Sequence, residues 1–173
     1  MRNVLTKLEE HKLAILFCDL RQFTNLTEKL TENKDQFPQG IPFLEKLLQS
    51  YLSKASQIIE DHHSGWVDKF IGDAVLGVFG LHFKEYYDRG IPPTHRALYS
   101  AFEINDFVSG VLRKEMENLF FVLHDKQQFK NIKDVTKMLQ VSVGFGLDFG
   151  SVLFGEIGSD DRKNFTVIGD TVN

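Results

Sequence analysis

The sequence holds a single cysteine, Cys18, among its 173 residues, so no disulfide bond can form within the chain. A chain of this kind is typical of a reducing compartment. Long apolar runs are also lacking, since none approaches the roughly 20 residues that cross a bilayer. The charged segment at residues 1–12 is unlike a signal peptide. We therefore expect no membrane insertion within this segment and a cytoplasmic location, alone or as part of a larger multidomain or membrane-attached protein.

Positive charge is not in excess either. The chain has 20 lysines and arginines against 24 aspartates and glutamates, a formal net charge of −4. It therefore lacks the basic field that nucleic-acid binding requires, and we expect no nucleic-acid partner. What is present is 42% hydrophobic and 25% charged residues, which is the balance of a folded globular protein. The length suits one domain with a sizeable core, spanning residues 1–173.

Apolar periodicity predicts both strands and helices. The predicted elements are a buried strand at residues 13–19, a long helix from Phe43 to Gly65, two strands within residues 67–80, a helix at residues 94–117, a β-hairpin at residues 139–158 and a strand at residues 164–168. The turn of the predicted hairpin falls at residues 148–150. Asn25 and Glu28 have the spacing of a capping box, which predicts a helix start with Asn25 as its cap.

The second helix is expected to bury Ala97, Leu98, Ala101, Phe102 and Ile104, which recur at helical spacing. Residues 118–139 show no clear period and are interpreted as a possible insertion at the domain edge. The order of the elements predicts an α+β fold. It consists of an antiparallel-rich, ferredoxin-like sheet with helices on one face.

Two aspartates stand at the ends of apolar strands. Asp19 ends the first buried strand, and Asp73 begins the apolar run AVLGVFG. If the two strands are neighbours, the carboxylates converge, and a divalent cation is the usual resolution of their repulsion. On spacing alone a second interpretation stays open, in which Asp19 caps a turn and Asp73 stabilises the hairpin. Lys69 likewise fits a solvated strand lysine or an ion-pair partner of Asp68 or Asp73.

Three sequence blocks, AILFCDLRQFTNLTE, GWVDKFIGDAVLGVFG and VGFGLDFGSVLFGEIGSDDRKNFTVIGDTVN, follow one another between Ala14 and Asn173. Together they resemble the class III adenylyl/guanylyl cyclase catalytic domain. The connections at about residues 31–43 and 81–139 carry no signature of this family. The resemblance implies the class III cyclase fold, which is the ferredoxin-like arrangement predicted above.

The resemblance also implies a metal site and a phosphate site. Asp19 and Asp73 would hold two divalent cations, Mg²⁺ or Mn²⁺, with the backbone carbonyl of Leu20 as a further ligand. The backbone N–H groups of the loop through Gln22, Phe23 and Thr24 would bind the triphosphate. Many members of the family carry glycine where Gln22 stands, but backbone donors do not require it.

The residues that the resemblance assigns to the nucleoside are Lys69, Thr166 and Asn173. Adenylyl cyclases carry lysine at the position of Lys69, where guanylyl cyclases typically have glutamate. Thr166 replaces the aspartate of hormone-regulated enzymes, as in the subgroup of bicarbonate-stimulated bacterial cyclases and soluble adenylyl cyclase. Asn173 would orient the ribose.

The implied activity is that of an adenylate cyclase, a phosphorus–oxygen lyase that converts ATP to 3′,5′-cyclic AMP and pyrophosphate by two-metal-ion catalysis. The implied site forms between two domains arranged head to tail, so the partner would be a second copy in a homodimer or another cyclase-like domain. The alternatives are a guanylyl cyclase and a non-catalytic cyclase-like regulatory or binding domain. In the family the helix that begins at Asp170 continues beyond the position of Asn173. The expectation is therefore a catalytic domain truncated at its C-terminal end, with weak nucleotide binding and little activity.

Overall fold

A computed structural model describes residues 8–81, 90–124, 132–159 and 161–172, so the predicted site residue Asn173 lies outside the described residues. One antiparallel sheet organises the chain, with the strand order β2-β3-β1-β4-β5. The strands are β1 (Glu9–Arg21), β2 (Trp66–Ile71), β3 (Ala74–Phe79), β4 (Ser142–Gly158) and β5 (Lys163–Ile168). The predicted α+β, ferredoxin-like fold is confirmed.

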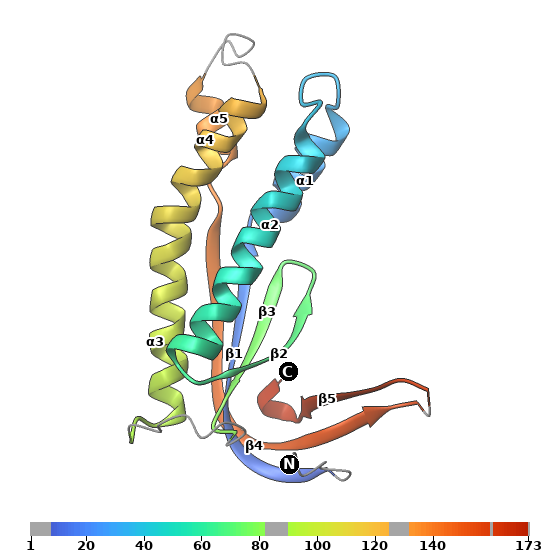
Figure 1. Cartoon of the computed structure of the whole chain (residues 1–173), viewed down its shortest axis with the longest axis vertical. Coiled ribbons are helices and arrows are strands. Elements are labelled where there is room, and N and C mark those ends of the chain that lie inside the picture. Colours follow the sequence, from blue (N-terminus) through green and yellow to red (C-terminus); the bar gives the residue numbers. More distant parts are fainter. Residues whose placement is uncertain (1–7, 82–89, 125–131, 160, 173) are drawn as a thin grey trace.

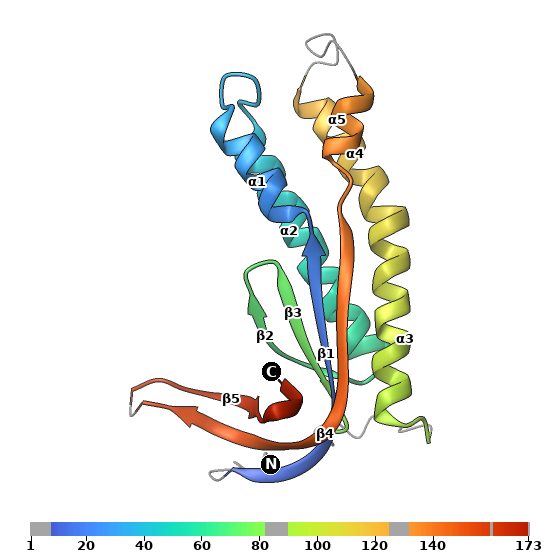
Figure 2. The same ribbon diagram turned by 180° about the vertical axis from the view of Figure 1, so that it is seen from behind.

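The helices lie on one face of the sheet (Figures 1 and 2). They are α1 (Phe23–Glu32), α2 (Gly40–Gln57) with its π-helical extension η1 (Ile58–His62), α3 (Pro93–Asp106), the π-helical segment η2 (Phe107–Leu112), α4 (Arg113–Leu123) and α5 (Ile132–Met138). A short 3-10 helix, η4 (Asp170–Val172), follows β5. None of the helices in the described part of the chain is long and apolar enough to span a membrane.

The side chains of β1 alternate between two apolar clusters, one on each face of the sheet. Ala14, Leu16, Cys18 and Leu20 are buried against the helices. Their neighbours on the strand, which include Leu13, are buried on the other face with residues of β3, β4 and β5. We call this second face, which carries Leu13, Ile15, Leu76 and Val78, the distal face. Since successive side chains of a strand point to opposite faces, Asp19 belongs to the distal face as well.

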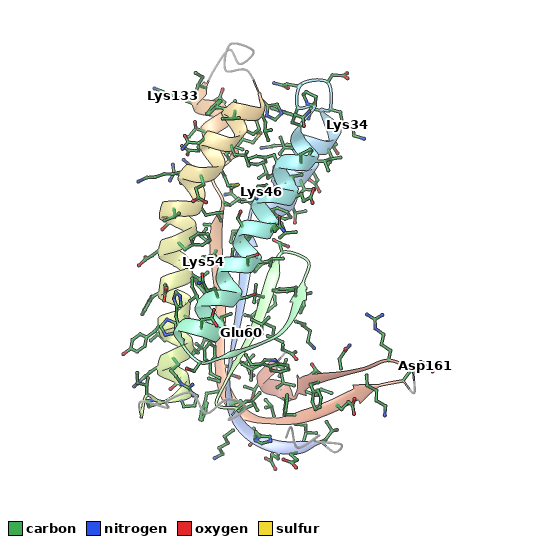
Figure 3. The ribbon with its side chains drawn as sticks, in the orientation of Figure 1. Lys34, Lys46, Lys54, Glu60, Lys133 and Asp161 are labelled. Carbon is green, nitrogen blue, oxygen red and sulfur yellow. The ribbon has the colours of Figure 1, made fainter. Side chains whose placement is uncertain are left out.

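The predicted hairpin at residues 139–158 is wrong, because β4 is one continuous strand. It pairs with all of β1, from Glu9 opposite Phe154 to Arg21 opposite Ser142, and Asp148 lies mid-strand opposite Ile15. None of the glycines in the first half of β4 has the positive φ that a tight turn favours. The chain reverses only after β4, near Asp161, which Figure 3 shows at the tip of the β4–β5 hairpin.

The helix predictions were partly wrong. The predicted inward positions Leu98 and Phe102 are 41% and 58% exposed, whereas Ala97, Ala101 and Ile104 are buried as expected. The buried residues of α3 are Ala97, Ser100, Ala101 and Ile104, a narrower inward face than the one predicted. In the segment interpreted as a possible insertion, Phe120, Val135 and Leu139 are buried in the main core.

The capping-box prediction was also wrong. Helix α1 begins at Phe23, so Asn25 and Glu28 lie inside it, and the preceding residue is Gln22 with φ 70° and ψ 2°. The Gln22 carbonyl accepts a hydrogen bond from the Leu26 N–H at 2.9 Å, which closes the first turn. A left-handed conformation lets the chain pass from the end of β1 into α1 without a linker. This left-handed conformation is disfavoured for a residue with a Cβ atom, which explains why glycine suits position 22.

We expect Gln22→Gly to raise the free energy of unfolding by up to about 1 kcal/mol, because glycine removes the strain of the left-handed conformation. The gain is limited because glycine also raises the backbone entropy of the unfolded chain. The matched control is Gln39→Gly. Gln39 is likewise exposed and likewise precedes a helix, but its φ of −104° is unstrained. Urea unfolding of both variants measures the difference. A Gln22→Gly protein no more stable than the Gln39→Gly protein would contradict the assignment of strain to Gln22.

Candidate active site

Two carboxylates converge where β1 meets the β2–β3 turn. Asp19 of β1 lies opposite Ala74, the residue that follows Asp73. Burial raises the pKa of the Asp73 carboxyl, its own backbone N–H lowers it through a hydrogen bond, and the charge of Asp19 raises it again; the net shift is upward. The repulsion expected from neighbouring strands is therefore present in the folded chain.

The chain compensates this negative charge only weakly. A guanidinium nitrogen of Arg21 lies 3.7 Å from Oδ2 of Asp19, and the Arg21 side chain is largely exposed to solvent. An exposed ion pair of this length contributes little. The guanidinium also occupies the space that a side chain at Gly144, the cross-strand neighbour of Asp19, would fill.

The two carboxylates fit a divalent cation of the Mg²⁺ type. Among the described residues no group of three or more His, Cys, Asp or Glu side chains is placed to hold a metal ion. Mg²⁺ does not need such a cage, since in phosphate chemistry it takes one or two carboxylates and completes its shell with water and substrate oxygens. Asp19 and Asp73 offer that donor set, and both their proximity and the raised pKa of Asp73 are what an uncompensated cation site requires.

The strand end that carries Asp19 is anchored from the helix side. The buried hydroxyl of Tyr51 in α2 donates a hydrogen bond to the Cys18 carbonyl at 3.2 Å. Burial raises the pKa of the Cys18 thiol to about 12, so Cys18 is a core residue. Leu20 is buried in the same core. Cys18 and Leu20, one on each side of Asp19, therefore hold the backbone of this strand end in place.

The first turn of α1 follows directly from this strand end. The first intrahelical hydrogen bond is donated by the Leu26 N–H. The helix therefore offers no acceptor to the three preceding N–H groups, those of Phe23, Thr24 and Asn25. Free N–H groups at a helix start attract anions. The predicted phosphate-binding residues are therefore Gln22, which joins β1 to α1, and Phe23 and Thr24, the first two residues of α1.

A second polar group forms where β5 passes beside β2. The Lys69 ammonium donates to the Thr166 hydroxyl at 2.6 Å, and the Thr166 hydroxyl donates to Oδ2 of Asp68 at 2.9 Å. Lys69 Nζ also lies 3.0 Å from the same Asp68 oxygen. The ion-pair partner of Lys69 is therefore Asp68 and not Asp73. A cleft of about 450 Å³ opens beside this group, lined by Trp66, Asp68, Lys69, Ile157, Asn164, Phe165 and Thr166.

The structure brings the predicted residues together in two sets and not in one. Asp19 and Asp73 form one set, Lys69 and Thr166 form the other, and the cleft at Lys69 is lined by neither aspartate. Lys69 pairs with Leu76, so it shares the distal face with Asp19. Asp68 was not among the predicted site residues. The signal that could have found it is a carboxylate beside the lysine in the otherwise apolar strand WVDKFI.

Known proteins resemble this chain both in sequence and in fold. An adenylate cyclase of Anabaena cylindrica is 31% identical over 162 residues, which are 94% of this chain but only 26% of that protein. The crystal structure of the adenylyl cyclase CyaB from P. aeruginosa is 25% identical with a TM-score of 0.68, and the match covers 96% of this chain and 69% of that chain. The guanylyl cyclase Cya2 is also 25% identical, with a TM-score of 0.64 and coverage of 95% and 66%.

These relatives include cyclases of both nucleotide types, so similarity alone does not choose between ATP and GTP. The profile of the adenylate and guanylate cyclase catalytic domain matches residues 5–173. Because that match covers nearly the whole chain, the protein belongs to the adenylate and guanylate cyclase catalytic domain family.

Proposed function

We propose that the chain is an adenylyl cyclase catalytic domain that converts ATP to 3′,5′-cyclic AMP and pyrophosphate. The observation that carries the choice of ATP is the Lys69 ammonium at the cleft beside Thr166. An ammonium group only donates hydrogen bonds. It suits N1 of adenine, which accepts, and opposes N1 of guanine, which carries a proton.

The alternatives lack a supporting residue. A guanylyl cyclase needs an acceptor opposite guanine N1, and Lys69 supplies none. Non-catalytic cyclase-like domains commonly lose a metal-binding aspartate, whereas Asp19 and Asp73 are both present and adjacent. Thr166 supports membership of the bicarbonate-responsive subgroup, which forms part of this proposal on that single residue.

The proposed reaction is an in-line attack of the ribose 3′-oxygen on the α-phosphorus of ATP. The bond from the α-phosphorus to the bridging oxygen breaks, and pyrophosphate leaves. Asp19, Asp73 and the Leu20 carbonyl would hold two divalent cations. When bound, these cations lower the pKa of the 3′-hydroxyl and neutralise charge on the phosphates. The N–H groups at Phe23 and Thr24 would bind phosphate oxygens, and Asn173 would orient the ribose.

Two copies of the domain, or this domain with another cyclase-like domain, are needed for a complete site in this proposal. Asp19 and Lys69 share the distal face, while the cleft at Lys69 is lined by neither Asp19 nor Asp73. Head-to-tail pairing across this face would set the aspartates of one copy opposite Lys69 and Thr166 of the other.

We expect the chain, incubated with Mg²⁺ or Mn²⁺ at concentrations that favour a dimer, to form cyclic AMP from ATP and far less cyclic GMP from GTP. Chromatography of the products against both cyclic nucleotides identifies them. Heat-treated protein is the control. Cyclic GMP as the main product would overturn the assignment to ATP.

We expect Asp19→Ala and Asp73→Ala to abolish cyclisation, because each removes a carboxylate from the cation site. The metal-free Asp73→Ala protein should be at least as stable as the parent, since burial and Asp19 both disfavour the charge of Asp73. Asp106→Ala is the matched control, an exposed aspartate at the end of α3, away from the distal face. Near-normal turnover by either active-site variant would show that the cation site lies elsewhere.

We expect Lys69→Glu to lower kcat/KM for ATP by about 10²-fold or more, because an acceptor then faces the N1 acceptor of adenine. Lys69→Met separates loss of the donor from repulsion by the neighbouring Asp68 and should show a smaller loss. Lys163→Glu, at an exposed lysine of β5, controls for the change in net charge. If the ratio of ATP to GTP turnover stays the same in both Lys69 variants, Lys69 does not read the purine.

A further inference from the structure

We propose that Asp68 is a positioning residue that determines purine specificity, because it fixes the direction of the hydrogen bonds in the Lys69–Thr166 pair. The inference rests on the proposed ATP specificity and extends it to a residue that does not itself need to touch the base.

The backbone of β2 brings Asp68 to this position. Val67 pairs with Gly77 and Lys69 pairs with Leu76, so Asp68 is the extra residue of a β-bulge. Side chains of consecutive strand residues normally point to opposite faces, but a bulge can turn two of them to the same side. As a result the carboxylate of Asp68 reaches both the adjacent Lys69 and Thr166 of β5.

The Asp68 carboxylate is buried, but only one of its two oxygens has a partner among the described residues. Its side chain is 0% exposed. The hydrogen bond from Thr166 and the ion pair with Lys69 both use Oδ2, whereas the buried Oδ1 has no hydrogen-bond partner among the described residues. A buried carboxylate with an unsatisfied oxygen is costly to the fold. An apolar side chain of similar size should therefore be tolerated, and the benefit of Asp68 has to come from what it does to its two neighbours.

The chemistry of the three groups dictates the direction of each bond. A carboxylate only accepts, and an ammonium only donates. The Thr166 hydroxyl lies between them, so it must give its single proton to Asp68 and accept from Lys69. Its remaining lone pair can only accept. Lys69 directs one of its three protons to Thr166 and forms an ion pair with Asp68, which leaves a proton for a ligand at the cleft, where its side chain is 42% exposed.

The group therefore presents one donor and one acceptor to the purine edge. Adenine offers the complementary pair, an acceptor at N1 and a donor at the 6-amino group. Guanine offers the opposite pair, a donor at N1 and an acceptor at O6. Without Asp68 the Thr166 hydroxyl could turn and donate to O6. Asp68 thus excludes guanine at the threonine position, independently of the exclusion by Lys69 at N1.

The test compares Asp68→Val, which removes the acceptor, with Asp68→Asn, which keeps one acceptor oxygen. Calorimetry measures the dissociation constants of 3′-deoxy-ATP and 3′-deoxy-GTP, which lack the attacking hydroxyl, in the presence of Mg²⁺. We expect the preference for the adenine nucleotide to fall at least about tenfold in Asp68→Val and to be largely kept in Asp68→Asn. We also expect the melting temperature of Asp68→Val to be no lower than that of the parent, which a purely structural role would not allow.

A second set of variants tests whether Asp68 acts through Thr166. Thr166→Val removes the hydroxyl, and Asp68→Val added to it should change the preference no further, because the group that Asp68 orients is already gone. An additional loss in the double variant would overturn the proposed route. Asp68→Ala provides a second non-accepting side chain. Failure of both Asp68→Val and Asp68→Ala to fold would show a structural role and overturn the proposal.

The outcomes for Asp68 and for ATP specificity are distinguishable. If the parent protein binds 3′-deoxy-GTP as tightly as 3′-deoxy-ATP, the proposed ATP specificity fails and this inference fails with it. If the parent prefers 3′-deoxy-ATP and Asp68→Val has the same preference, only the role of Asp68 is rejected. An equal loss of affinity for both nucleotides also rejects it.

Discussion

The long antiparallel pairing of β1 with β4 is the constraint on which the rest of the structure depends. It runs without interruption from Glu9 opposite Phe154 to Arg21 opposite Ser142. At one end it carries the chain to Asp19 and directly into α1. At the other end β4 continues past β1 and curves, which is visible in Figures 1 and 2, so that β5 reaches the neighbourhood of β2. β2 and β5 are the two edge strands of the sheet, so without that curvature Thr166 could not meet Lys69.

Three carboxylates of the sheet show two ways of keeping charge beside apolar strands. Asp19 and Asp73 stand at the rim, where neither is fully buried and their repulsion is left for a cation to relieve. Asp68 is buried and is paired with the ammonium of its own neighbour. In the proposed function the first arrangement is a cation-binding site, because the positive charge that would relieve the repulsion comes from outside the chain. In the second arrangement the positive charge is the Lys69 ammonium of the chain itself, which helps to orient the Thr166 hydroxyl.

Several elements could be predicted from the sequence because their signals are local. The apolar run after Asp73, the helical spacing from Leu44 to Ile58 and the apolar run that begins at Leu13 all predict the observed element type. The family resemblance is confirmed by the profile match. The start of α1 was misplaced because it depends on a left-handed Gln22 that no capping motif indicates. The strand β4 was misread as a hairpin because its glycines resemble turn signals. They are extended because β1 supplies an uninterrupted edge for pairing.

The sequence by itself determined the chemical character of the site. Lysine can only donate, paired aspartates favour a hard cation, and the three sequence blocks identify the family. These properties belong to the residues and do not change with their surroundings. Only the tertiary structure decided which residues act together. Lys69 and Thr166 are 97 positions apart in the chain. Asp68 contacts both of them because it is the extra residue of the β-bulge, where the register of the β2–β3 pairing shifts between Val67 and Lys69. The pairing register is set by contacts between different strands. No local pattern in WVDKFI could therefore have revealed the bulge at Asp68.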